Sequence, residues 1–80
     1  MLSELENGIK CIGVKQSKKA IKDGHVRRIF IAEDAESRVK QPIEDMCREK
    51  GLVPVSVPTM RELGDACGID VGAAVAVLLK

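Results

Sequence analysis

The stretch Gly13-Val14-Lys15-Gln16-Ser17-Lys18-Lys19 decides the fold of this chain, because it joins an apolar strand to a helix. The strand is predicted by four apolar residues: Ile9, Cys11, Ile12 and Val14. The helix follows through Ala20 and Ile21 and ends at Asp23-Gly24. A helix start carries backbone N–H groups without partners and the positive end of the helix dipole. The three lysines of the stretch therefore predict an anion site, and phosphate is the natural anion.

The rest of the chain alternates between strand and helix patterns. Apolar runs predict three further strands: 26–32, 52–57 and 73–79. Helical spacing predicts two further helices: 35–50 and 60–67. Thr59 is suited to cap the second of these, with Glu62 at the capping-box position. This alternation predicts an α/β sandwich with helices on both faces of a small sheet, in which the last run is central.

Two prolines leave the element boundaries open. Pro42 interrupts the helical pattern of residues 35–50, so the helix either kinks there or begins there. Pro54 indicates an edge position or a strand start, since proline cannot donate to a sheet ladder.

Size and composition restrict the class of protein. A chain of 80 residues predicts one domain, residues 1–80. No apolar run approaches the ~20 residues of a membrane span, and the acidic start Met1–Glu6 lacks the pattern of a signal peptide. The three cysteines are widely spaced with no C-x-x-C, which predicts buried thiols and no metal site. We expect a cytoplasmic protein that acts as a monomer.

The positive charge is concentrated in one quarter of the chain. Residues 10–28 carry seven basic residues against one acid, whereas the remainder carries six basic and eleven acidic residues. This distribution predicts a basic face suited to nucleic acid, although a lysine-rich solvated helix would give the same pattern.

The sequence does not favour an enzyme or a cofactor. No second glycine precedes the lysines as a P-loop requires, and G-x-G-x-x-G is absent. One histidine, His25, gives no nucleophile–base pair. The glycines Gly64, Gly68 and Gly72 fit a helix cap and a turn into a tightly packed strand better than a phosphate loop.

The single aromatic residue, Phe30, excludes common modes of single-stranded RNA binding, which stack bases on aromatic platforms. What fits is recognition of RNA shape. Polar side chains at the start of a helix would read base edges in a widened groove, with lysines on phosphates.

Two separated motifs resemble the ribosomal L-seven-Ae family of kink-turn RNA-binding proteins, and in particular its small bacterial, YbxF-like members. The first is the stretch from Gly13 to Lys19, and the second is Leu63-Gly64-Asp65-Ala66-Cys67-Gly68-Ile69-Asp70-Val71-Gly72-Ala73-Ala74. The resemblance covers nearly the whole chain. It implies a three-layer α-β-α sandwich with a mixed sheet of about four strands.

The resemblance also implies which residues bind RNA. A kink-turn is a sharply bent duplex with sheared G·A pairs beside an extruded nucleotide. Lys15 and Gln16 would read guanine edges with Lys19 nearby, and Ser17 and Lys18 would contact phosphates next to the N–H groups after Gly13. The tip before the last strand would pack on the extruded nucleotide through Ile69, Asp70, Val71 and Gly72. Glu33 approaches the RNA or forms an exposed acidic turn with Asp34. The partner would be ribosomal RNA or another structured RNA such as a riboswitch.

One departure from the family concerns specificity. Archaeal and eukaryotic members usually carry Asn-Glu where this chain has Lys15-Gln16. The change removes an acceptor charge and adds a cation, so we expect softer sequence discrimination and greater salt sensitivity.

Two alternatives remain open at this point. One is a protein–protein adaptor that uses the acidic helix around Glu44, Asp45 and Glu49. The other is a small nucleotide-binding regulatory domain.

Overall fold

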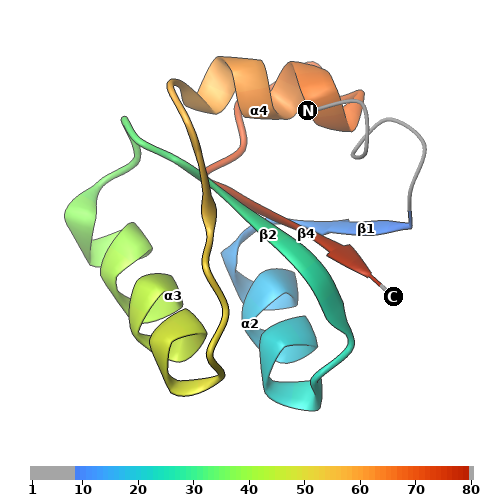
Figure 1. Ribbon diagram of the computed structural model, residues 1–80. Helices are drawn as coiled ribbons and strands as arrows, with labels where there is room; N and C mark the ends of the chain where they lie inside the picture. The colour runs from blue at the N-terminus through green and yellow to red at the C-terminus, as the bar shows by residue number, and fades with distance from the viewer. Residues whose placement is uncertain (1–8, 80) are drawn as a thin grey trace.

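The protein, described here by a computed structural model over residues 9–79, is a four-stranded sheet with helices on both faces (Figure 1). Residues 1–8 and Lys80 lie outside the described residues. The elements in chain order are β1 (Lys10–Ile12), α2 (Val14–Asp23), β2 (Val26–Ala32), α3 (Ser37–Glu49), β3 (Val55–Val57), α4 (Met60–Cys67) and β4 (Val75–Leu79). This confirms the predicted α-β-α sandwich.

The sheet is mixed, with the strand order β1-β4-β2-β3. The last strand, β4, lies between β1 and β2 and is antiparallel to both, whereas β2 and β3 are parallel. β4 is buried from Val75 to Leu78, which explains its continuous apolar sequence. Pro54 precedes β3, which is an edge strand, as the sequence indicated.

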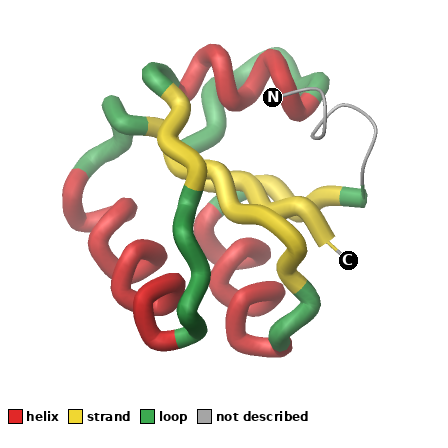
Figure 2. Tube along the Cα trace, viewed as in Figure 1, coloured by secondary structure: helices red, strands yellow, loops and turns green. Residues whose placement is uncertain are grey.

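Two hydrophobic clusters hold the layers together, one on each face of the sheet. Ile21 of α2 and Ile43 of α3 pack with Ile29 and Val77 of the sheet. On the other face, Leu63 of α4 packs in the cluster that holds Phe30, Val57 and Leu78. Figure 2 shows this division, with α2 and α3 below the strands and α4 above them. No helix within residues 9–79 is long and apolar enough to cross a membrane.

Some predicted boundaries are wrong by a few residues. Val14 belongs to the helix and not to the first strand, because Gly13 turns the chain with a φ of 101°. The third and fourth strands begin later than predicted, at Val55 and Val75.

Pro42 lies inside α3, so the helix does not begin there. The missing N–H of Pro42 deprives the carbonyl of Arg38 of its helical partner. Arg38 is exposed, so water can replace the lost hydrogen bond.

The segments that carry the predicted site residues leave the sheet at one edge, which we call the loop edge and which lies at the left-hand end of the sheet in Figure 1. Three backbone hydrogen bonds hold it together. The N–H of Gly13 donates to the Val75 carbonyl at 3.0 Å, that of Ala32 to Ala74 at 2.9 Å, and that of Glu33 to Val57 at 2.7 Å. The start of α2, the turn after β2 and the tip before β4 therefore share this edge.

Candidate nucleic-acid interface

The start of α2 is an open helix N-terminus. Gly13 is its N-cap and offers no side chain, and the first turn contains no acidic residue. The first helical hydrogen bond at this end runs from the Ser17 N–H to the Gly13 carbonyl at 3.0 Å. The three preceding N–H groups therefore have no partner within the helix. Lys15, Gln16 and Lys19 are exposed around them, so the site is positive and presents donors to solvent.

The start of α4, which follows the same edge of the sheet, is closed by the chain itself. The Glu62 N–H donates to the Thr59 hydroxyl at 3.1 Å. The Met60 N–H donates to the Asp34 carboxylate at 2.8 Å. The sequence predicted the Thr59 cap, but not the hydrogen bond that Asp34 accepts from Met60, because 26 residues separate the two. Asp34 is thus occupied in capping α4.

The tip, which we define as residues 69–72, is fixed firmly against α4. The Ile69 N–H donates to the Gly64 carbonyl at 3.1 Å, and the Ala73 N–H donates to the Met60 carbonyl at 2.9 Å. A Cβ atom on Gly64 would clash with the carbonyl oxygen of Val71. Glycine at this position lets the tip lie directly on the helix, in agreement with the tightly packed turn that the glycine spacing predicted.

The tip presents an aliphatic side chain to solvent. Val71 is 70% exposed. Ile69 is less exposed, because part of its side chain packs against the cluster around Leu63. The tip and α4 together line a hollow of about 540 Å³. It is larger than the hollow beside α3, which has a volume of about 340 Å³. The residues that line the larger hollow are Arg61, Asp65, Ile69, Asp70, Val71 and Gly72.

Sequence reasoning missed Arg61 as a residue of this hollow. Its signal was present, because Arg61 and Asp65 are four residues apart and therefore share one face of α4. Both are exposed, on the helix against which the tip lies.

The open helix start and the tip both lie at the loop edge. Gly13, which precedes α2, is bonded to Val75, which follows the tip by three residues. A ligand that occupies the loop edge can therefore meet Lys15 and Gln16 as well as Val71.

Ser17 is buried at the start of α2, although it is predicted to contact phosphates. The residue is completely buried, and its hydroxyl has no hydrogen-bond partner in the part of the chain that the structure describes. Its N–H is already bonded to Gly13. The contact of Ser17 with phosphates stays a prediction, and the burial of its hydroxyl does not favour it, because the fourth residue of α2 faces the core. Lys18, which is partly buried, is left for that role.

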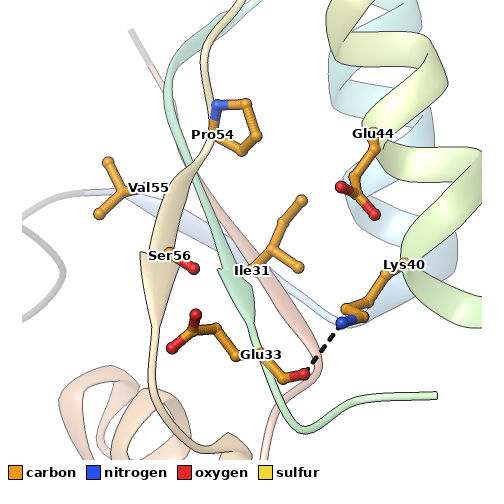
Figure 3. A pocket seen from close by; sticks show the side chains of 7 residues that line it. All are labelled: Ile31, Glu33, Lys40, Glu44, Pro54, Val55 and Ser56. Atoms are coloured by element: carbon orange, nitrogen blue, oxygen red, sulfur yellow. Dashed lines mark hydrogen bonds between the residues drawn. The ribbon is translucent and has the colours of Figure 1, made fainter. Parts of the chain in front are cut away.

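Glu33 is at the loop edge, but it lines a separate hollow between α3 and the β2–β3 edge of the sheet (Figure 3). The Lys40 ammonium group donates to the backbone carbonyl of Glu33 at 2.9 Å. The remaining lining residues include Glu44 and Ser56. With two carboxylates and one ammonium group, this hollow does not attract a phosphate.

The cysteines behave as buried thiols at two of three positions. Cys47 and Cys67 are buried, and Cys11 is half-buried. Burial raises the pKa of Cys47 and of Cys67, so both are protonated at neutral pH. Within residues 9–79, no group of three or more potential ligands could hold a metal ion.

Comparison with known proteins identifies the family of this chain. Residues 4–80 match the ribosomal protein L7Ae/L30e/S12e/Gadd45 family. An RNA-binding protein of Caldanaerobacter subterraneus is 48% identical over 67 residues, which cover 84% of this chain and 82% of that protein. The RNA-binding protein YbxF of Geobacillus stearothermophilus is 34% identical over 76 residues, 95% of this chain and 93% of the relative.

A solved structure shows the same fold. The 15.5 kD RNA-binding protein of Giardia lamblia superposes with a TM-score of 0.91 at 25% sequence identity, covering 99% of this chain and 70% of that one. Together with the match over residues 4–80, this similarity shows that the chain belongs to the ribosomal protein L7Ae/L30e/S12e/Gadd45 family.

Proposed function

We propose that this chain is a single-domain, monomeric and non-enzymatic protein that binds kink-turns in structured RNA. The observation that carries the proposal is the shared loop edge, where an open positive helix start and an exposed aliphatic tip both lie. The relatives named as RNA-binding proteins support RNA as the ligand. The resemblance of the two sequence motifs to kink-turn binders supports the bent motif as its target.

In this proposal the start of α2 reads the sheared G·A pairs. The ammonium group of Lys15 donates to guanine O6 and N7, and the Gln16 amide supplies a donor and an acceptor. The unpartnered N–H groups of the first turn, with Lys18 and Lys19, hold phosphates.

The tip acts by shielding a base. Val71 covers the extruded nucleotide, while Arg61 stands at the rim of the same hollow, where it can pair with a phosphate. Because this contact needs apolar surface and not an aromatic ring, the lack of aromatic residues outside Phe30 does not oppose it.

Binding of this kind stabilises the bent RNA, because the protein contacts the bent form better than the extended form. Three to five phosphate contacts would give a slope of log affinity against log salt of roughly −2 to −5. A slope near zero would contradict the assignment of phosphate contacts.

The experiment that tests the site compares two double variants for binding to a kink-turn and to a straight duplex. Lys15→Ala with Gln16→Ala should abolish the preference for the kink-turn, since each good base contact contributes about 1–3 kcal/mol of discrimination. The control, Arg38→Ala with Gln41→Ala, removes a cation and an amide from the exposed surface of α3 and should keep the preference. Retention of the preference by the first variant would show that the site is elsewhere.

The same assay separates the two alternatives. An adaptor that uses α3 would bind its protein partner equally well without Lys15 and Gln16. A nucleotide-binding domain would be stabilised against heat by mononucleotides and not by folded RNA. The Glu33–Glu44 hollow gives no support to the second alternative, because its net charge is negative.

A further inference from the structure

A second basic surface lies at the opposite end of the molecule from the loop edge. The sequence suggested one basic face over residues 10–28, but α2 separates that stretch into two groups. The ten residues of α2 rise about 15 Å, with Lys15 at one end and the Gly24 turn at the other. The chain then returns into β2, so Arg27 and Arg28 lie at the far end of the sheet from Lys15.

A β-bulge presents the two arginines. The register between β2 and β4 shifts between Val26 and Arg28, which inserts an extra residue into β2. Val26 and Ile29 then both face the cluster around Ile21, although three residues of a regular strand would place them on opposite faces. Both arginines between them are exposed. The bulge therefore places two consecutive cations outside the core.

The arginines border a hollow at the open side of β2. β3 pairs only with the second half of β2, from Phe30 to Ala32. Beside the first half, a hollow of about 350 Å³ is lined by Arg27, Arg28, Ile29, Gly51, Leu52, Val53 and Val55. Val53 is 88% exposed, so an aliphatic side chain lies next to the cations.

Lys50 extends the basic surface. It lines an adjoining hollow with Gly24, Val26 and Leu52, and Leu52 belongs to both hollows. Among residues 9–79, no acidic side chain lines either hollow. Figure 1 shows why these residues meet, because α2 and α3 both end at this side of the molecule.

Neutralisation of helix ends does not account for this surface. Lys22 and Arg48 lie in the last turns of α2 and α3, where they offset the negative ends of the helix dipoles. Arg27 belongs to a strand, so no helix end explains it. Arg27 is therefore the cation that no helix end explains, and Lys50, the C-cap residue of α3, adds an exposed ammonium group beside it.

We propose that the surface formed by Arg27, Arg28, Lys50 and Val53, the bulge surface, binds the phosphate backbone of a second RNA segment. The proposal rests on the proposed function, because it adds a second contact to a protein that holds a kink-turn at the loop edge. RNA is favoured because its phosphates match a surface of cations with no acidic lining. The two surfaces lie at opposite ends of a molecule about 30 Å long, so one chain can join two RNA segments.

The test measures binding of a labelled straight RNA duplex to protein already saturated with an unlabelled kink-turn RNA. The native chain should bind the second RNA at low salt. Arg27→Ala with Lys50→Ala should weaken this binding and reduce the salt slope by about 1.8, the value for two lost phosphate contacts. Affinity for the minimal kink-turn should stay unchanged.

The matched control is Arg38→Ala with Arg48→Ala, which removes two exposed arginines that form ion pairs with Glu36 and Asp45. This variant should bind the second RNA as the native chain does. Equal losses in both double variants would overturn the proposal, because they would reflect net charge alone. Absence of any second RNA on the native chain would also overturn it.

A further arm distinguishes failure of this proposal from failure of the proposed function. The variant Lys15→Ala with Gln16→Ala should still bind the straight duplex through the bulge surface. If this variant loses the preference for the kink-turn but still binds the duplex, the second surface is supported independently of the first. The native chain is also tested with phosphatidylserine vesicles and with an acidic peptide. If it binds either of them through Arg27 and Lys50 but does not bind the duplex, the surface belongs to another partner and the RNA proposal is overturned.

Discussion

The starts of α2 and α4 lie at the same edge of the sheet, yet they treat their free N–H groups in opposite ways. At α4, Thr59 and Asp34 accept hydrogen bonds from the first turn, and Glu62 adds negative charge. At α2, glycine occupies the capping position and the neighbouring charges are positive. The chain satisfies one helix start with its own oxygen atoms and leaves the other for an anion from outside. The difference teaches that α4 is closed by the chain itself, whereas the start of α2 stays open, which is why the proposed function assigns RNA binding to α2.

The largest effect is expected from Gly64→Ala, which breaks the support that α4 gives to the tip. The new Cβ atom would clash with the Val71 carbonyl, so the backbone of the tip must move. We expect the free energy of unfolding to fall by about 3 kcal/mol, as measured by urea denaturation, with weaker RNA binding. Gln41→Ala, on the exposed surface of α3, is the control and should change stability by less than about 0.5 kcal/mol. Unchanged stability of Gly64→Ala would show that the tip is not held in this way.

Removal of both caps from α4 should have the next largest effect. Asp34→Ala with Thr59→Ala leaves the Met60 and Glu62 N–H groups without their partners. The loss should be about 2 kcal/mol of unfolding free energy, measured by thermal denaturation. RNA affinity measured well below the melting temperature should hardly change. A large loss of affinity without a loss of stability would instead place Asp34 at the RNA.

Ser17→Ala tests the buried hydroxyl near the start of α2, which makes no hydrogen bond within the described residues. Its Oγ atom is buried and has no partner, in contrast to the Thr59 hydroxyl. The substitution should raise the free energy of unfolding by about 1 kcal/mol, since a buried polar group without a partner is unfavourable. Filter binding should give the native affinity for a kink-turn. A clear drop in affinity would support the predicted contact between Ser17 and phosphate.

Gln16→Glu should have the smallest effect on stability, and it makes the α2 start more like that of α4. A carboxylate in the first turn of a helix stabilises it by about 0.5 kcal/mol. It also restores the acid that archaeal and eukaryotic members of the family usually carry, so discrimination between kink-turn and straight duplex should increase. Titrations at several salt concentrations check this, and a decrease in discrimination would contradict the assigned role of Gln16.

The fold could be predicted from the sequence wherever a residue determines the structure of its own segment. Thr59 caps the start of α4, and Gly68 ends that helix. The apolar run of β4 likewise indicates a central strand without help from distant residues. The change from strand to helix at residues 13–19 could be predicted for the same reason, since glycine and lysines occur together there, although Val14 was wrongly placed in the strand. The resemblance to the family then indicated the tip.

What the sequence could not predict depends on contacts between distant residues. The hydrogen bond that the Met60 N–H donates to Asp34 exists only once the sheet has formed, and so does the closeness of Arg61 to Val71. The burial of Ser17 depends on where the α2 helix begins, and Val14 was placed in the strand. The division of the basic stretch into two surfaces follows from the direction of α2, which charge counting cannot show.

The position of β4 in the sheet has a consequence for synthesis of the protein. β4 follows the other three described strands in the sequence and joins β1 to β2, so those three strands have no complete sheet to enter until β4 is made. Both hydrophobic clusters include residues of β4. The nascent chain must therefore wait until Val75–Leu79 has left the exit tunnel before its interior can close.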